Sequence, residues 1–432
     1  MTMPEPPEDG GVSGWEQRRL SDLASFEKGR VVACVPNPEN GTMPYIGADS
    51  FRGNFNQFTT DAAAVACETS DVLMLWDGER SGLCATGLRG AIGSTVARLR
   101  PKPSVNGRFL YHQLTRHFAW IQARRTGTGV PHVPKDLGAT LVVPVPRKEC
   151  EQSRIAAVLD TVDGAIAKTE AVIAKLKQVR AGLLHNFLTR GLDENGQVRD
   201  PIAHPEQFRE SPLGEIPAVW KFDPLGIVCE KGGGSIQTGP FGSQLHASDY
   251  KDEGIPIITV EHLGENEILH DNLPLVGAED YRRLQRYHLR VGDLVFSRVG
   301  AIDRCAFVSE DEEGWLYSGR CLRVRTGTGA IKPRFLSYQL NSYPCRRWIV
   351  NHSVGSTMYC LNTSILSQVP VLIPPPDEQD SLATILSTHD QVLRSEEQML
   401  AKLCATKSGL MTDLLTGRVH VPENIIDGGR HI

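Results

Sequence analysis

The stretch Glu151-Gln152-Ser153-Arg154-Ile155-Ala156-Ala157-Val158-Leu159 is repeated later in the chain, as Glu378-Gln379-Asp380-Ser381-Leu382-Ala383-Thr384-Ile385-Leu386. The offset between the copies is 378 − 151 = 227, and it holds without a gap as far as Leu188-Thr189 and Leu415-Thr416. A constant offset over so long a stretch is not chance similarity. Solenoid repeats recur every 20–50 residues or so, and the period here is far longer. The chain is therefore a duplication of one large unit.

Each half of the chain has the same internal order. Trp15 and Trp220 open the halves, and short apolar runs such as 71–75 and 292–296 follow, bounded by Gly and Pro. Such runs are typical of strands separated by turns. A proline-rich stretch closes each strand-rich region, at 143–146 and 373–376. About 40 proline-free residues come next, and a continuous helix of that length would be roughly 60 Å long.

Both proline-free segments, 150–190 and 377–417, carry an apolar heptad seam. An ordinary buried amphipathic helix is one explanation, but equal lengths and a gapless offset favour mutual pairing as an antiparallel coiled coil. Arg180 and Lys407 interrupt the two seams at the same step. They set the register or, as the side-chain type favours, reach solvent. The predicted pairing residues are Leu159, Ile166, Ile173, Leu176, Leu183, Phe187, Leu386, Leu393, Leu400, Leu403, Leu410 and Leu414.

These patterns predict an α+β fold with pseudo-twofold symmetry, in which two strand-rich domains are each followed by a long helix. The paired helices are expected to form a spacer with one strand-rich domain at each end. The predicted boundaries are a flexible tail at 1–14, a first strand-rich domain at 15–148, a helix at 149–190, an acidic linker at 191–217, a second strand-rich domain at 218–375, a helix at 376–418 and a tail at 419–432.

Composition is that of a globular protein, with 40% hydrophobic and 22% charged residues. No apolar run is long enough to cross a bilayer, and the ten scattered cysteines predict reduced thiols without a zinc site. The net charge is −5, of which 1–14, 192–216 and 419–432 contribute −3, −4 and −1. The remainder carries −5 − (−8) = +3. A mildly basic remainder permits DNA binding, with other subunits supplying part of the phosphate contact.

Three motifs in the second half point to a known family. They are Ile236-Gln237-Thr238-Gly239-Pro240-Phe241-Gly242-Ser243-Gln244-Leu245, then Val291-Gly292-Asp293-Leu294-Val295-Phe296-Ser297-Arg298-Val299-Gly300, and Pro374 to Gln379 with Leu414-Leu415-Thr416-Gly417. In this order, and within a duplication, the chain resembles the specificity subunits of type I restriction-modification enzymes along nearly its whole length. The first half departs from the pattern at Trp76-Asp77-Gly78-Glu79, so we expect a different subclass of recognition domain there.

The resemblance implies a division of labour. Each strand-rich domain is expected to read one part of a split, asymmetric target in double-stranded DNA, while the helices fix the spacing and dock two methyltransferase subunits. S-adenosylmethionine would be carried by those subunits, and ATP and Mg by separate motor-nuclease subunits. The chain itself would be a non-catalytic DNA-binding subunit in a prokaryotic cytoplasm, without a cofactor, metal or membrane contact of its own.

Basic, Gly-punctuated clusters at equivalent places in the two halves are candidates for DNA contact. Arg, Asn and His suit base edges in the major groove, and Gly127-Thr128 matches Gly355-Ser356 as a close approach to a phosphate. The alternative is a solvated helix end, with Trp120 and Trp348 in the core. The predicted DNA-binding residues are Arg80, Arg124, Arg125, Thr126, Thr128, His132, Lys135, Gln237, Gln244, Arg298, Arg304, Asn351, His352, Ser356 and Thr357.

Two other functions compete with sequence reading. A hidden nuclease or transferase would need a catalytic motif, and the chain has no phosphate-binding P-loop, no dinucleotide fingerprint and no Asn-Pro-Pro-Tyr-like methyltransferase motif. A coiled-coil scaffold without sequence reading has no need for two unlike strand-rich domains. Sequence recognition by two different domains is therefore the preferred interpretation.

Overall fold

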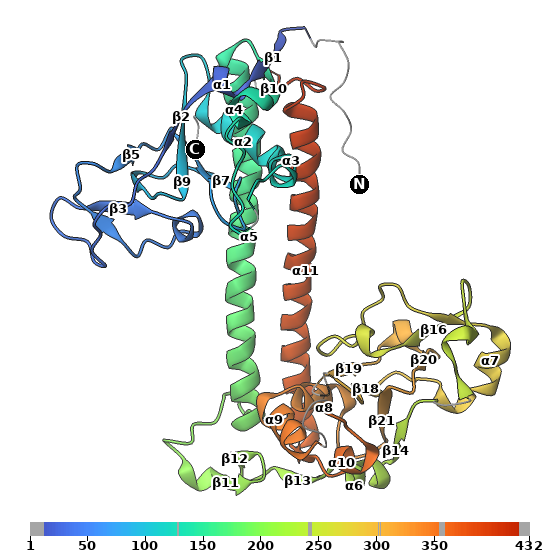
Figure 1. The fold of residues 1–432 in the computed structure, drawn as a ribbon. Coiled ribbons are helices and arrows are strands. Elements are labelled where there is room, and N and C mark those ends of the chain that lie inside the picture. Colours follow the sequence, from blue (N-terminus) through green and yellow to red (C-terminus); the bar gives the residue numbers. More distant parts are fainter. Residues whose placement is uncertain are drawn as a thin grey trace. The chain divides into compact units, whose positions relative to one another are not determined.

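The computed structural model describes residues 13–127, 129–240, 244–300, 302, 304–353 and 359–422. The chain forms two compact units: unit 1 contains 1–171 with 397–432, and unit 2 contains 172–396. Two long helices, α5 (Glu149–Thr189) and α11 (Pro376–Leu414), each contribute to both units (Figure 1). The predicted α+β class, with two strand-rich halves that are each followed by a long helix, is confirmed.

Unit 1 contains two four-stranded sheets and one two-stranded sheet. The main antiparallel sheet has the order β2-β9-β6-β7, the outer sheet has the order β4-β3-β8-β5, and β1 pairs with β10. The strands are β1 (Trp15–Arg19), β2 (Ala24–Lys28), β3 (Met43–Ile46), β4 (Phe58–Thr59), β5 (Val65–Cys67), β6 (Val72–Leu75), β7 (Cys84–Thr86), β8 (Gly90–Ile92), β9 (Val96–Pro101) and β10 (Val142–Pro146). The short helices are α1 (Leu20–Leu23), α2 (Gly107–Arg116), α3 (Phe118–Ala123) and α4 (Leu137–Thr140).

Unit 2 repeats this plan with a main sheet β14-β21-β18-β19, a pair β13-β22 and an outer sheet β15-β17-β16-β20, and it adds the hairpin β11-β12. The strands are β11 (Phe208–Ser211), β12 (Gly214–Pro217), β13 (Lys221–Pro224), β14 (Gly233–Thr238), β15 (Tyr250–Lys251), β16 (Ile255–Ile258), β17 (Leu275–Val276), β18 (Leu294–Ser297), β19 (Cys305–Phe307), β20 (Leu316–Tyr317), β21 (Cys321–Gly327) and β22 (Pro370–Ile373). The short helices are α6 (Leu225–Lys231), α7 (Ala278–Arg283), α8 (Pro333–Leu340), α9 (Tyr343–His352) and α10 (Thr363–Ser367).

The outer sheets differ between the units, although both contain one parallel pair. β3 pairs with β8 in unit 1, as β16 pairs with β20 in unit 2. An antiparallel strand also flanks the pair in both units, β4 next to β3 and β17 next to β16. The difference is at the edges, where unit 1 adds β5 next to β8 and unit 2 adds β15 next to β17. The main sheets are thus the shared framework, and the outer sheets are where the two units diverge.

The helices pack together and run antiparallel in each unit. In unit 1, Ile155 and Leu159 of α5 share a core with Met411 and Leu414 of α11. In unit 2, Phe187 at the end of α5 shares a core with Leu386 near the start of α11. All twelve predicted pairing residues are buried or half-buried.

The preferred prediction for Arg180 and Lys407, that they reach solvent, is wrong. Arg180 donates to Asp390 at 2.6 Å and to Glu265 at 2.9 Å, and its side chain is only 16% exposed. Lys407 pairs with Asp163 at 2.5 Å. Burial would lower the pKa of Arg180, but the two carboxylates raise it, so the guanidinium remains charged. Each unit therefore contains an ion pair between the helices, and the two pairs lie at equivalent steps of the seam.

The start of each long helix is fixed to its own unit by the same pair of side chains. The indole N–H of Trp15 donates to Glu151 at 3.3 Å, and that of Trp220 donates to Glu378 at 3.1 Å. The next residue, a glutamine in both copies, accepts one backbone N–H and donates to two backbone carbonyls. This shared network explains why Glu-Gln is preserved in both copies of the repeat.

Proline marks strands as well as the boundary before each helix. Residues 143–146, expected to be a stop, lie in β10, which pairs with β1 alone. Proline is tolerated there because a two-stranded ladder leaves one edge of β10 unpaired. None of the described helices is long and apolar enough to cross a membrane.

Candidate nucleic-acid interface

Two loops of unit 1 that are far apart in sequence converge into one surface. The loop after β6 contacts the loop after α3 through the N–H of Gly78, which donates to the carbonyl of Pro131 at 2.8 Å. The N–H of Val133 donates to the carbonyl of Trp76 at 2.9 Å. The chain thereby brings Arg80 next to the predicted cluster 124–135, and these segments form the first candidate surface.

The basic residues of this surface have different roles. The Arg124 guanidinium lies 3.9 Å from the ring centre of Trp120, and its side chain is exposed. Arg125 is half-buried and donates to the carbonyls of Gln122 and Glu79, at 2.9 and 2.7 Å. Arg125 therefore holds the two loops together, while Arg124 faces outward on an aromatic platform.

His132 is also tied into the loop structure. Its Nδ1 lies 2.7 Å from Asp77, which also pairs with Lys28 at 2.7 Å. Burial raises the pKa of Asp77, but hydrogen bonds from Lys28 and His132 outweigh it and lower the pKa below its usual value. Thr126 and Lys135 are exposed, Arg80 is half-buried, and Thr128 lies outside the described residues.

Unit 2 places equivalent loops together. The backbones of Val299 and Cys360 form an isolated β-bridge, as those of Asp77 and His132 do in unit 1. The N–H of Leu361 donates to the carbonyl of Arg298 at 2.9 Å. Asn351 and His352 are exposed at the end of α9, and Arg304 is exposed after the turn. Ser356 and Thr357 lie outside the described residues. Segments 298–299 and 360–361 of unit 2 therefore meet where 77 and 132 meet in unit 1, whereas Gln237 lies on β14 and Gln244 contacts Tyr287.

Trp120 and Trp348 were expected to be buried in the core, but both are only half-buried. Each packs against its hydrophobic core with one part of the ring. The exposed part carries a basic side chain: Arg124 lies over Trp120, and His352 stacks on Trp348 at 3.9 Å. An aromatic support beneath a cationic or imidazole side chain is thus common to both surfaces.

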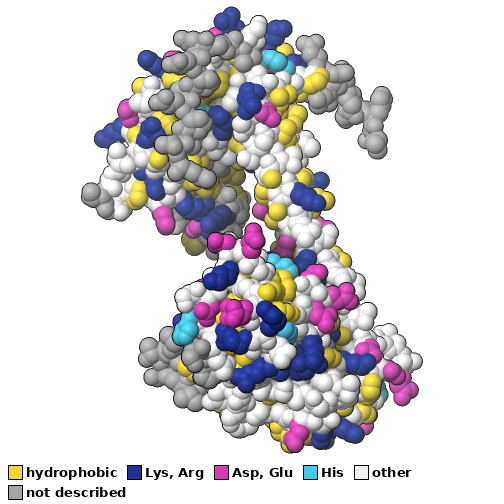
Figure 2. Space-filling view, turned by 90° about the vertical axis from the view of Figure 1, so that its right-hand side faces the viewer, with side chains coloured by type: hydrophobic (Ala, Val, Ile, Leu, Met, Phe, Trp, Pro, Cys, Tyr) yellow, Lys and Arg dark blue, Asp and Glu magenta, His cyan; other side chains and the backbone are white. Residues whose placement is uncertain are grey.

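The sequence interpretation missed an arginine cluster around Gln244. Gln244 accepts hydrogen bonds from the Tyr287 hydroxyl at 2.7 Å and from Arg286 at 3.2 Å, and its carbonyl accepts one from Arg283 at 2.7 Å. The run Arg282-Arg283-Leu284-Gln285-Arg286 was the available signal. Lys and Arg side chains gather on the face of unit 2 that carries α7 (Figure 2).

Among the described residues, one group of side chains offers three possible metal ligands: His112, Asp160 and Asp163. Asp160 already accepts from Arg108 at 2.9 Å, and Asp163 pairs with Lys407. Burial lowers the pKa of His112, which contacts Asp160 at 2.8 Å. With a cation on each carboxylate, this group is better suited to holding α2 against the helices than to binding a metal.

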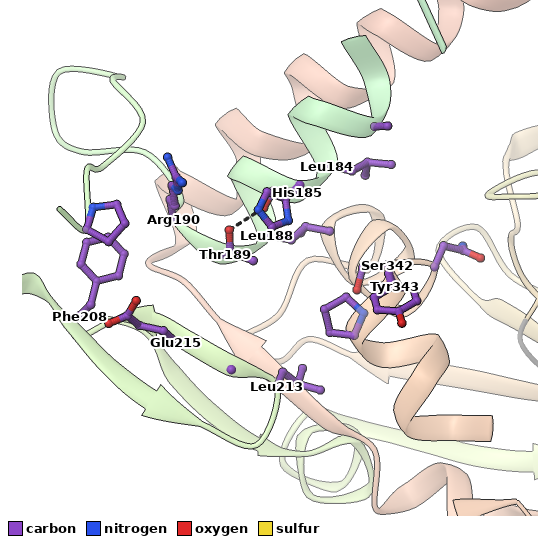
Figure 3. Close-up of a pocket in the computed structure, with 15 residues that line it drawn as sticks. Leu184, His185, Leu188, Thr189, Arg190, Phe208, Leu213, Glu215, Ser342 and Tyr343 are labelled. Atoms are coloured by element: carbon purple, nitrogen blue, oxygen red, sulfur yellow. Dashed lines mark hydrogen bonds between the residues drawn. The ribbon is translucent and has the colours of Figure 1, made fainter. Parts of the chain in front are cut away.

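An apolar cavity of about 580 Å³ lies in unit 2, between the end of α5, the β11-β12 hairpin and the start of α9. Figure 3 shows Leu184 and Leu188 of α5 and Leu213 of the hairpin among its lining side chains. Polar groups in the wall include His185, and Thr189 donates to the His185 carbonyl at 2.6 Å. The wall is mainly hydrophobic and offers no catalytic arrangement.

Comparisons with known proteins agree on one family. Residues 12–178 and 220–405 match the family described as the type I restriction modification DNA specificity domain. The type I restriction enzyme MjaVIII specificity subunit of Methanocaldococcus jannaschii is 24% identical over 416 residues, which are 94% of this chain and 93% of that protein. The EcoDI specificity subunit of Escherichia coli is 22% identical over 408 residues, 90% of this chain and 81% of that one.

The fold is also found in a solved structure. The crystal structure of a type I restriction-modification system S subunit from M. genitalium has a TM-score of 0.64 with this chain, at 17% identity. The likeness covers 96% of this chain and 99% of that one. At this level of identity the likeness concerns the fold, including the pair of long helices.

Proposed function

This chain belongs to the DNA specificity subunits of type I restriction-modification systems, and from that premise we propose that each unit reads one half of a bipartite, asymmetric target. A specificity subunit is a non-catalytic part of its enzyme. Sequence selection would be carried by the loops that meet in each unit, 76–80 with 124–127 and 129–135 in unit 1, and 298–300 with 359–361 and the exposed end of α9 in unit 2.

One observation supports this proposal more than any other. The two units share their main sheets and their Trp–Glu and Gln networks, yet differ at the equivalent loop positions. Asp77 and His132 face each other in unit 1, whereas Val299 and Cys360 do so in unit 2. A duplicated frame with different side chains at its loops is what recognition of two different half-sites requires.

We further propose that the paired helices set the half-site spacing and dock two methyltransferase subunits. Val172 and Val179 of α5, and Ile385 and Val392 of α11, are 40–46% exposed. Each lies one residue before a seam position, so in an antiparallel pair all four fall on one side of the seam. An exposed apolar stripe along a helix pair suits a helical partner.

The helix surface can be tested with one substitution and its neighbour. Val392→Asp is expected to weaken co-purification of the methyltransferase subunit at least tenfold, because it places a charge in an apolar contact. Gln391→Asp, on the adjacent exposed position, adds the same charge and is expected to leave co-purification unchanged. Equal retention of the partner by both variants would contradict docking on this stripe.

The remaining parts of the reaction are assigned to the partners. S-adenosylmethionine would be bound by the methyltransferase subunits, and ATP and Mg by motor-nuclease subunits, in the cytoplasm where the DNA is found. This chain would contribute only DNA selection and assembly. The Val392→Asp substitution tests the assembly surface, and DNA selection needs a separate test.

Sequence reading is tested by mapping methylated bases in cells that express this chain with its methyltransferase subunit. The expected result is a split, asymmetric motif that disappears when the chain is omitted. If the two proteins bind each other but no motif is methylated, the chain would act as a scaffold only, and the proposal that it reads sequence would be wrong. This control matters because a coiled-coil adaptor would pass the co-purification test.

A further inference from the structure

A buried arginine in unit 2 lacks the carboxylate that its counterpart in unit 1 possesses. In unit 1, Arg98 on β9 lies opposite Glu27 on β2, and the two form an ion pair. In unit 2, Arg323 on β21 lies opposite Gln237 on β14. The duplication thus replaces an acid by its neutral amide while it keeps the arginine.

Arg323 is 4% exposed, and the structure shows a single side-chain hydrogen bond for it, to the Ser235 hydroxyl at 2.9 Å. Its buried Nε, like that of Arg98, has no hydrogen-bond partner among the described residues. The side-chain oxygen of Gln237, Oε1, accepts a hydrogen bond from the Tyr317 hydroxyl at 3.4 Å. A buried charge without a direct ion pair is costly, and it favours binding of an anion.

Arg323 lines a polar cavity of about 470 Å³. Exposed Arg286 and Arg290 also line it, with His288 and Arg325, and Glu313 is its acidic member. Arg325 is neutralised by Asp293, which it contacts at 2.7 Å. The wall therefore has an excess of positive charge after its own ion pair is counted.

We propose that this cavity binds a phosphate group, supplied either by the DNA backbone or by a free phosphate ion. Guanidinium groups suit phosphate because they offer several N–H donors in a fixed plane. The cavity adjoins the predicted DNA-binding residues, since Arg286 also donates to Gln244 and Gln237 lies opposite Arg323. The DNA alternative rests on the proposed function, whereas the free-ion alternative does not.

The duplication supplies a precise test variant, Gln237→Glu. It restores the acid that unit 1 carries at Glu27, so the new carboxylate is expected to pair with Arg323 and replace the bound anion. Gln391→Glu, on the exposed surface of α11, is the matched control for charge. Arg290→Ala removes an exposed arginine from the rim without altering the core, and it serves as a second variant if Gln237→Glu fails to fold.

The first arm measures the melting temperature of the full chain with inorganic phosphate against chloride at equal ionic strength. Phosphate is expected to raise the melting temperature of the wild type and of Gln391→Glu, because a ligand of the native state stabilises it. Gln237→Glu and Arg290→Ala are expected to weaken phosphate binding at least tenfold. If phosphate changes the melting temperature of the wild type and of both pocket variants equally, free phosphate does not bind in the cavity.

The second arm measures DNA affinity against salt for the chain with its methyltransferase subunit. If a backbone phosphate occupies the cavity, Gln237→Glu and Arg290→Ala lower the slope of log K against log[salt] by about one. A change in either arm supports the proposal and identifies the source of the phosphate, and no change in both overturns it. Failure of the complex to bind DNA at all would contradict the proposed function, and the first arm would still decide on the cavity.

Discussion

The two units contain an equivalent arginine–aspartate ion pair, and its contribution to the free energy of unfolding depends on pH. Arg100 donates two hydrogen bonds of 2.9 Å to Asp71, and Arg325 donates two to Asp293, of 2.7 and 2.5 Å. Burial raises the pKa of Asp71, but the bonds from Arg100 and from the N–H of Glu68 lower it below 3.8. A lowered folded-state pKa means that the stabilisation is complete above the unfolded value and is lost as pH falls through the folded one.

Asp71→Asn is therefore expected to reduce the free energy of unfolding at pH 7 by about 2 kcal/mol, because it leaves a half-exposed arginine without its partner. The difference from wild type should shrink as pH falls below about 4, because the carboxylate of the unfolded chain then binds a proton that the folded one does not, and it should disappear below the folded-state pKa. Urea unfolding at pH 7 and pH 3 measures both values. Asp22→Asn, on an exposed residue, is the control, and an equal loss at both pH values would contradict the explanation.

Arg124 is the basic residue of unit 1 whose surroundings best fit contact with DNA. Arg124→Ala is expected to weaken DNA binding severalfold at low salt and to reduce the salt slope by about one, since one phosphate contact is lost. Binding titrations of the methyltransferase complex at several salt concentrations measure this. Lys148→Ala, an exposed basic residue before α5, is the control. Unchanged affinity would remove the first candidate surface from the interface.

At the scale of elements, heptad spacing was sufficient to predict the two long helices and their packed face. Leu159 and Leu414 lie in the core of unit 1, and Phe187 and Leu386 in that of unit 2, as expected. The partners of Arg180 could not be predicted, because Glu265 is distant in sequence and comes from a loop. The same holds for the candidate site: composition identified the basic loops, but only tertiary contacts show that Arg125 is structural and Arg124 exposed.

The ion pair between the helices of unit 2 can be dissected by a double-mutant cycle. Arg180→Met leaves Asp390 buried with only the Tyr338 hydroxyl, which donates to it at 2.9 Å. A loss of about 3 kcal/mol in the free energy of unfolding is expected. Arg180→Met with Asp390→Leu should recover most of this loss, because an apolar pair replaces both charges.

The exposed pair Arg89 and Glu68 provides the comparison for that cycle. Their side chains are 76% and 54% exposed, so the coupling between them should be below about 1 kcal/mol. If the double substitution at the seam were as destabilising as the two single losses added together, the pair would be acting independently. The shared explanation for Arg180 and Lys407, that each is half of a buried inter-helix pair, would then be wrong.

For the whole molecule, the duplication predicts that the two halves of the target can be altered separately. Arg80 lies in the converging loops of unit 1 and Asn351 at the exposed end of α9 in unit 2, and their side chains suit guanine and adenine edges respectively. Arg80→Ala should relax one half of the methylated motif, and Asn351→Ala the other, each at a cost of about 1–3 kcal/mol in discrimination. Methylation mapping with each variant measures the change.

Each of these variants is the control for the other, because the frame, the helices and the partner surface stay the same. A loss of methylation spread evenly over both halves would indicate weaker binding or folding, not altered reading. A relaxed base in one half, with the other half intact, cannot arise from a general loss of affinity. Separate responses would therefore assign each half-site to its own unit, and would show that the differing loops on a repeated frame determine which asymmetric sequence is selected.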